Sequence, residues 1–112
     1  MSERLYHSSD VELSVSHDQL HVAGRPGFDN ARALADAGTA WLARHSGSSV
    51  VLDVTATESV NSGILCVLLE WLRQARRHQV AVQQVKLPER LQELVHVSGL
   101  APVFNAAPSL AG

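Results

Sequence analysis

The residue with the clearest chemical potential is Ser62, which stands between Asn61 and Gly63 in the segment VNSGI. A hydroxyl there could act as a nucleophile, line a phosphate site, accept a phosphoryl group or begin a helix. A serine hydrolase of the nucleophile-elbow type needs G-x-S-x-G, and this segment lacks the first glycine. Nothing in the sequence brings Asp53 and a histidine to Ser62, so an enzyme is the least favoured interpretation.

Other patterns that carry chemistry are missing or weak. Neither the Walker A pattern nor G-x-G-x-x-G occurs, and GRPGFDN matches neither, so we expect no nucleotide and no cofactor. The six histidines mostly fall at the ends of predicted elements or on polar faces, and the single cysteine offers no thiolate cluster. We therefore expect no metal site. Cys66 is expected to be a core thiol, and one cysteine fits a reducing compartment.

The bulk properties indicate one ordinary globular domain. The chain has 112 residues, 46% hydrophobic and 18% charged, with a formal net charge of −2. This charge gives no reason to expect nucleic acid or an anionic membrane as a partner. Arg73, Arg76 and Arg77 are interpreted as a solvated helix face. No apolar run is long enough to span a bilayer, and the polar, alternating first residues predict no leader peptide.

Alternating apolar and polar residues predict two strands at 11–15 and 19–24, joined as a hairpin. GRPGFDN predicts a turn, after which Asp29 or Asn30 caps a helix that runs to about His45. The nearly all-apolar VVLDV, residues 50–54, predicts a central strand covered on both faces. TATESVN predicts the polar turn before Ser62.

From Ser62 to about His78 the sequence predicts a long helix, buried at its start and exposed at its end. A strand at 80–85 and a helix at 87–99 follow, the latter stopped by Gly99. The order is ββαβαβα, an α/β fold with a mixed sheet of four to five strands and right-handed crossovers. Residues 1–10 are predicted to be an N-terminal extension, 11–104 the domain and 105–112 a flexible tail.

The position of Ser62 on these elements leaves two interpretations open. Asn61 is a good N-cap, which makes Ser62 the first helical residue, at the positive end of the helix dipole. The pair could serve only to begin the helix. Alternatively, the hydroxyl is displayed on the surface, where a phosphate would suit the helix N-terminus but not a partner packed against an uncharged serine.

The segments LHVAG, DNARAL, VVLDVTATESVNSGILCVLLEWLRQARRH and LPERLQELVHVSGL together resemble a STAS domain over residues 11–104. Such domains carry Asp-Ser or Asp-Thr, then a small residue, between the central strand and the long helix. The resemblance places Ser62 at the phosphoacceptor position, with Asn61 in place of the usual acid and Gly63 as the small residue. Ile64 stands where a glycine is frequent.

Within STAS proteins, GILCVLLEWLRQARRH and VKLPERLQELVHVSGL most resemble the MlaB-like subunits of the Mla phospholipid ABC transport system. The resemblance implies a cytoplasmic, non-catalytic domain that sits on the MlaF ATPase at the inner membrane and supports its assembly and activity. The alternative is an anti-sigma factor antagonist, whose binding to an anti-sigma factor kinase is switched by phosphorylation of Ser62.

We expect the partner to contact the loops around the start of the long helix. The expected contact residues are Glu58, Ser59, Asn61, Ser62, Gly63, Phe28, Asp29 and Asn30. Phe28 is the one bulky apolar residue in these turns, so it is either an exposed anchor or a core residue under the first helix. Trp41 and Trp71 are expected to pack on the apolar sides of their helices.

Overall fold

A computed structural model describes residues 2–58, 62–100 and 102. The elements in chain order are β1 (Ser2–His7), β2 (Val11–Ser16), β3 (Gln19–Gly24), α1 (Phe28–Ala43), β4 (Ser49–Thr57), α2 (Ser62–Arg77), β5 (Ala81–Lys86) and α3 (Glu89–Val97). The strands form one sheet in the order β1-β2-β3-β4-β5. Strands β1, β2 and β3 pair antiparallel, whereas β3, β4 and β5 pair parallel. The α/β class and the mixed five-stranded sheet are thus confirmed.

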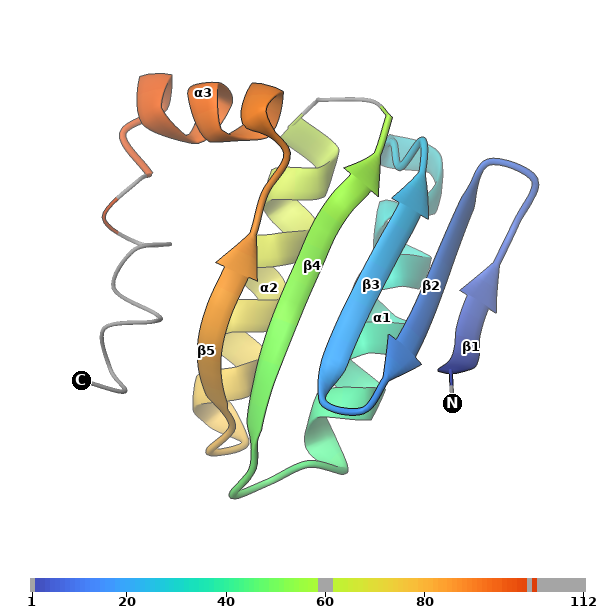
Figure 1. Ribbon diagram of the computed structural model, residues 1–112, viewed down its shortest axis with the longest axis vertical. Helices are drawn as coiled ribbons and strands as arrows, with labels where there is room; N and C mark the ends of the chain where they lie inside the picture. Colours follow the sequence, from blue (N-terminus) through green and yellow to red (C-terminus); the bar gives the residue numbers. More distant parts are fainter. Residues whose placement is uncertain (1, 59–61, 101, 103–112) are drawn as a thin grey trace.

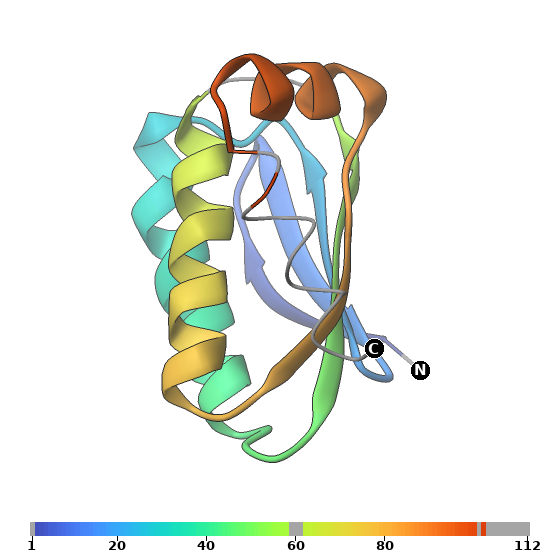
Figure 2. The ribbon, with the colours of Figure 1, turned by 90° about the vertical axis from the view of Figure 1, so that its left-hand side faces the viewer.

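The molecule has two layers, because α1 and α2 both pack on one face of the sheet (Figures 1 and 2). The core fills the space between them, with Leu13, Leu20 and Leu52 from the sheet fully buried. From the helices, Leu34 and Leu68 are buried in the same cluster. Helix α3 lies across one end of both layers, close to where α1 and α2 begin (Figure 2).

Helices α1 and α2 meet at Gly38 and Trp71. The Trp71 indole is fully buried, and its Nε1 donates a hydrogen bond to the Ala35 carbonyl oxygen at 3.2 Å. A Cβ atom on Gly38 would overlap the Trp71 indole. The absence of a side chain on one helix therefore makes room for the largest side chain of the other, which sets how closely the two helices approach.

Two element boundaries differ from the sequence prediction. Residues 2–7, assigned to an N-terminal extension, form β1 and pair with β2, with a register shift between Arg4 and Tyr6. Helix α1 begins at Phe28, with Gly27 as its N-cap, so neither Asp29 nor Asn30 is the cap. The start of α2 at Ser62 and the end of α3 before Gly99, which has φ +74°, match the prediction.

Two burial predictions were wrong. Strand β4 is covered on one face only: Val50, Leu52 and Val54 are buried, whereas Val51 is half-buried on the open face. Cys66 is exposed and not a core thiol. It lies seven residues before the exposed Arg73, so both share the outer face of α2. The side of α2 on which Cys66 lies decides its exposure, although its side chain is apolar.

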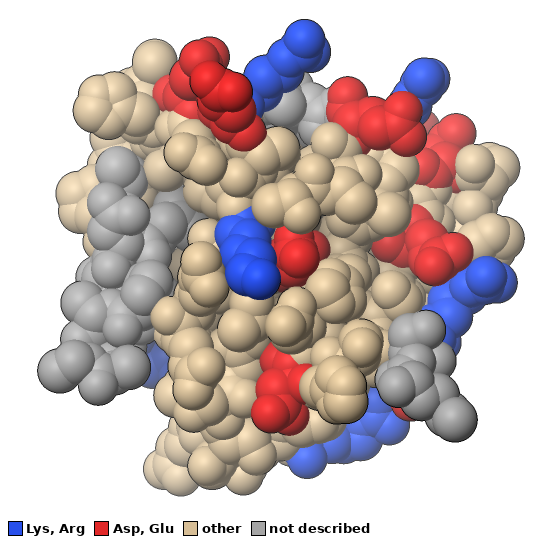
Figure 3. All heavy atoms as spheres, viewed as in Figure 1, with Lys and Arg blue, Asp and Glu red and all other residues tan. Residues whose placement is uncertain are grey.

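One row of polar residues crosses the open face of the sheet in register. It consists of Arg4, Ser14, His21, Asp53 and Lys86, one from each strand. His21 Nδ1 lies 3.4 Å from Asp53 Oδ2. Charged side chains are sparse in the middle of this face and gather at its edges (Figure 3). Opposite charges at neighbouring cross-strand positions stabilise the sheet.

The carboxylate of Asp53 should couple folding stability to pH. Burial raises its pKa, but hydrogen bonds from the Thr55 hydroxyl and N–H, together with the charges of His21 and Lys86, hold the pKa below its ordinary value of 3.8. A lowered pKa in the folded state stabilises the protein above pH 4, and this stabilisation is lost as pH falls through the folded pKa. Between pH 5 and pH 3, the free energy of unfolding measured in urea should therefore fall less for Asp53→Asn than for wild type. Asp36→Asn, at an exposed position of α1, is the control; equal acid sensitivity of wild type and Asp53→Asn would contradict the prediction.

Candidate functional site

The candidate site is the end of the molecule where parallel strands β3, β4 and β5 finish and helices α1 and α2 begin (Figure 1). Loops that follow the carboxyl ends of parallel strands are the usual place for binding functions in α/β folds. Gly24 closes β3 with φ +100°, and a Cβ atom there would overlap the Asp10 carbonyl oxygen. The Glu58 N–H donates to the Gly24 carbonyl oxygen at 2.6 Å. The ends of β3 and β4 are therefore held together beneath the loops.

The start of α1 holds one buried residue with a structural role and two exposed residues. Asn30 is 9% exposed, and its Oδ1 accepts a hydrogen bond from the Gly27 N–H at 2.9 Å. This bond satisfies a free amide at the helix start, so Asn30 acts within the fold. Asp29 is exposed, and the Phe28 side chain is 71% exposed. Phe28 is therefore an exposed residue and not a core residue under the first helix.

The turn before α2 holds the other expected contact residues. Glu58 is exposed at the end of β4, and Gly63 is buried in the first turn of α2. Ser59 and Asn61 lie outside the described residues, and Ser62 is described only as the first residue of α2. The fold thus brings the starts of α1 and α2 to the same end of the molecule (Figure 1).

Val97 belongs to this end and was missed by the sequence reasoning. It is the last residue of α3 and is 82% exposed. A signal was available, because Leu91, Leu94 and Val95 define the buried stripe of this helix and Val97 falls outside it. Among the residues that the structure describes, Phe28 and Val97 are the two exposed large hydrophobic side chains. Phe28 begins α1 at this end, and Val97 ends α3, which lies across it (Figure 2).

At this end of the molecule, acidic residues outnumber basic ones on the turns, on the first turn of α1 and on α3. The acidic residues are Asp10, Asp29, Glu58, Glu89 and Glu93, and the basic ones are Arg25, Arg90 and Lys86, which ends β5. Acidic groups lie beside basic ones along the corresponding edge in Figure 3. Exposed apolar side chains and an excess of acidic residues at one end of the molecule complement a partner surface that carries apolar pockets bordered by lysine and arginine.

Among the described residues, no group of three or more His, Cys, Asp or Glu side chains could hold a metal ion. His17 and His21 are four residues apart, but they lie on a hairpin, where that spacing does not place two side chains side by side as it does on a helix. None of the described helices has the length and apolar character needed to cross a membrane.

A mixed five-stranded sheet with two helices on one face, a third helix across its end and exposed loops at the carboxyl ends of its parallel strands is the STAS fold. A family model described as "Mlab, STAS domain" matches residues 9–104, so the chain belongs to this family. It is similar to a chain of the Acinetobacter MlaFEDB complex in the ATP-bound Vtrans2 conformation, with 28% sequence identity and a TM-score of 0.62. The similarity covers 73% of this chain and 85% of that chain. No curated protein matches the sequence.

Proposed function

We propose that this protein is a non-catalytic STAS subunit that binds and supports the ATPase of a phospholipid-transport ABC complex. The observation that carries the proposal is the similarity to a chain of the MlaFEDB complex over 73% of the sequence. In this role the domain is held at the inner membrane by its partner. It needs no cofactor, because its contribution is to position the ATPase.

The exposed residues at the start of α1 and just after β4 support this role. A side chain as large as Phe28, 71% exposed at the first position of a helix, gains most when a partner covers it. Val97 offers a second apolar group on α3. The acidic residues at this end, Glu58 and Asp29 included, favour a basic patch on the ATPase through charge complementarity. Phe28 is then the central anchor of the contact.

Affinity purification of the tagged full-length chain from its native host, read by mass spectrometry, tests the proposal. The expected result is co-purification of an ABC ATPase together with its membrane subunits. Recovery of a kinase-like anti-sigma factor in its place would support the antagonist function and overturn this one. Ester hydrolysis that is lost in Ser62→Ala would contradict a non-catalytic role.

Replacement of Ser62 by aspartate should weaken ATPase binding without loss of the fold. An acid suits the first turn of α2, because the helix dipole favours negative charge there. In the complex the same charge would be desolvated opposite a surface that packs against an uncharged serine, at a cost of about 1–3 kcal/mol. Circular dichroism should report unchanged helix content, and titration calorimetry should report the lower affinity. Binding equal to wild type would place Ser62 outside the interface.

A further inference from the structure

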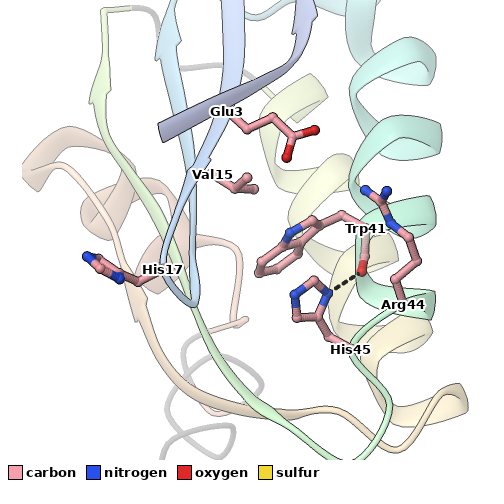
Figure 4. A pocket seen from close by; sticks show the side chains of 6 residues that line it. All are labelled: Glu3, Val15, His17, Trp41, Arg44 and His45. Atoms are coloured by element: carbon pink, nitrogen blue, oxygen red, sulfur yellow. Dashed lines mark hydrogen bonds between the residues drawn. The ribbon is translucent and has the colours of Figure 1, made fainter. Parts of the chain in front are cut away.

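A concave site lies at the end of the molecule opposite the candidate site, where α1 ends beside strands β1 and β2. It is a cavity of about 340 Å³ lined by Glu3, Val15, His17, Trp41, Arg44 and His45. A volume of this size falls at the lower end of the range typical of small-molecule sites. Trp41 and Val15 are buried and form its inner wall, whereas the imidazole of His17 points away from it (Figure 4).

The remaining side chains give this cavity two walls of opposite charge. Glu3 extends from β1 and Arg44 from the end of α1, and both point into the space beside Trp41 (Figure 4). Within the described residues, neither the carboxylate of Glu3 nor the guanidinium of Arg44 has an ion-pair or hydrogen-bond partner. Two unpaired opposite charges that face one cavity complement a ligand that itself carries both charges.

His45 and the end of α1 complete the polar lining. The Nδ1 atom of His45 lies 2.8 Å from the Trp41 carbonyl oxygen, and its ring lies 4.3 Å from the indole. The bond orients the imidazole with Nδ1–H as donor, which leaves the second nitrogen as an acceptor in the neutral ring. Arg44 provides donors for an anion, and the Glu3 carboxylate provides an acceptor for a cation.

We propose that this cavity binds a small zwitterion in which a primary ammonium group and a carboxylate or phosphate are separated by a few bonds. The ammonium group pairs with the carboxylate of Glu3, and the anionic group accepts hydrogen bonds from the guanidinium of Arg44. Two sources share this chemistry: a free amino acid and the ethanolamine phosphate headgroup of a phospholipid. The proposal is independent of the ATPase contact, because the two sites lie at opposite ends of the molecule.

NMR titration of the isolated full-length chain tests the proposal, with the indole N–H signal of Trp41 as the readout. The signal is assigned by its loss in Trp41→Phe, and the signal of the fully buried Trp71 is the internal reference. Glycerophosphoethanolamine and glycine represent the two sources. Glycerol 3-phosphate lacks the ammonium group and ethanolamine lacks the anion. We expect saturable shifts with at least one zwitterion and at least tenfold weaker binding of both truncated compounds.

Variants that each remove one charge test which residue binds the ammonium group and which binds the anionic group of the ligand. Glu3→Gln and Arg44→Gln should each reduce zwitterion affinity at least tenfold, whereas Glu12→Gln, on the open face of neighbouring β2, should leave it unchanged. The zwitterion that binds more tightly identifies the source. An indole signal that does not move with either zwitterion would overturn the proposal. So would equal binding of a truncated compound, or equal loss of affinity in Glu12→Gln.

Discussion

Replacement of Trp71 by alanine is expected to lower the free energy of unfolding by about 3–5 kcal/mol. The indole is fully buried between α1 and α2 and fills the space left by Gly38. Its loss creates a cavity that two rigid helices cannot close, and it leaves the Ala35 carbonyl oxygen without the donor at 3.2 Å. Urea unfolding followed by circular dichroism measures the change.

A graded series keeps this prediction testable if the alanine variant does not fold. Trp71→Phe keeps most of the ring and loses the N–H donor, so we expect a smaller loss of about 1–2 kcal/mol. Arg73→Ala is the matched control two residues along α2, with an exposed side chain that pairs with Glu70 at 3.1 Å. It should change stability by less than about 0.5 kcal/mol. Equal effects of the Arg73 and Trp71 variants would contradict this account of the helix contact.

Replacement of Phe28 by alanine is expected to weaken binding to the ATPase by about 2 kcal/mol or more, close to thirtyfold. This prediction rests on the proposed function. The side chain is 71% exposed in the isolated chain, so its removal costs the fold little. In the complex, the same removal would leave an unfilled pocket at the centre of the contact. Titration calorimetry with the purified ATPase measures the affinity, and thermal unfolding confirms an unchanged Tm.

Two further variants test how far the proposed contact extends from Phe28. Val97→Ala, at the end of α3, should weaken binding by a smaller amount, because valine offers less apolar area than phenylalanine. Arg77→Ala is the distant control, since it changes an exposed residue at the other end of α2. Wild-type affinity in Phe28→Ala would remove Phe28 from the interface, and a large loss in Arg77→Ala would move the interface to the opposite end.

Much of the fold could be predicted because local signals agreed with the final packing. The apolar 50–54 segment, the polar turn and the long helix after Ser62 predicted β4 and α2 in the right order. Gly99, with φ +74°, ends α3 where the sequence placed its stop. The contact surface stays a prediction. Among the residues expected there, Asn30 is buried and accepts a hydrogen bond from the Gly27 N–H, and the exposed Val97 was not considered.

The sequence by itself determined the class of fold, the order of most elements and the position of Ser62 at the start of the long helix. These features depend on hydrophobic periodicity and turn residues, which act over a few neighbouring positions. Only the tertiary structure decided that residues 2–7 join the sheet, that one face of β4 stays open, and that Glu3 faces Arg44 across a cavity. Periodicity shows which side chains share a face. What covers that face is decided by elements distant in the chain.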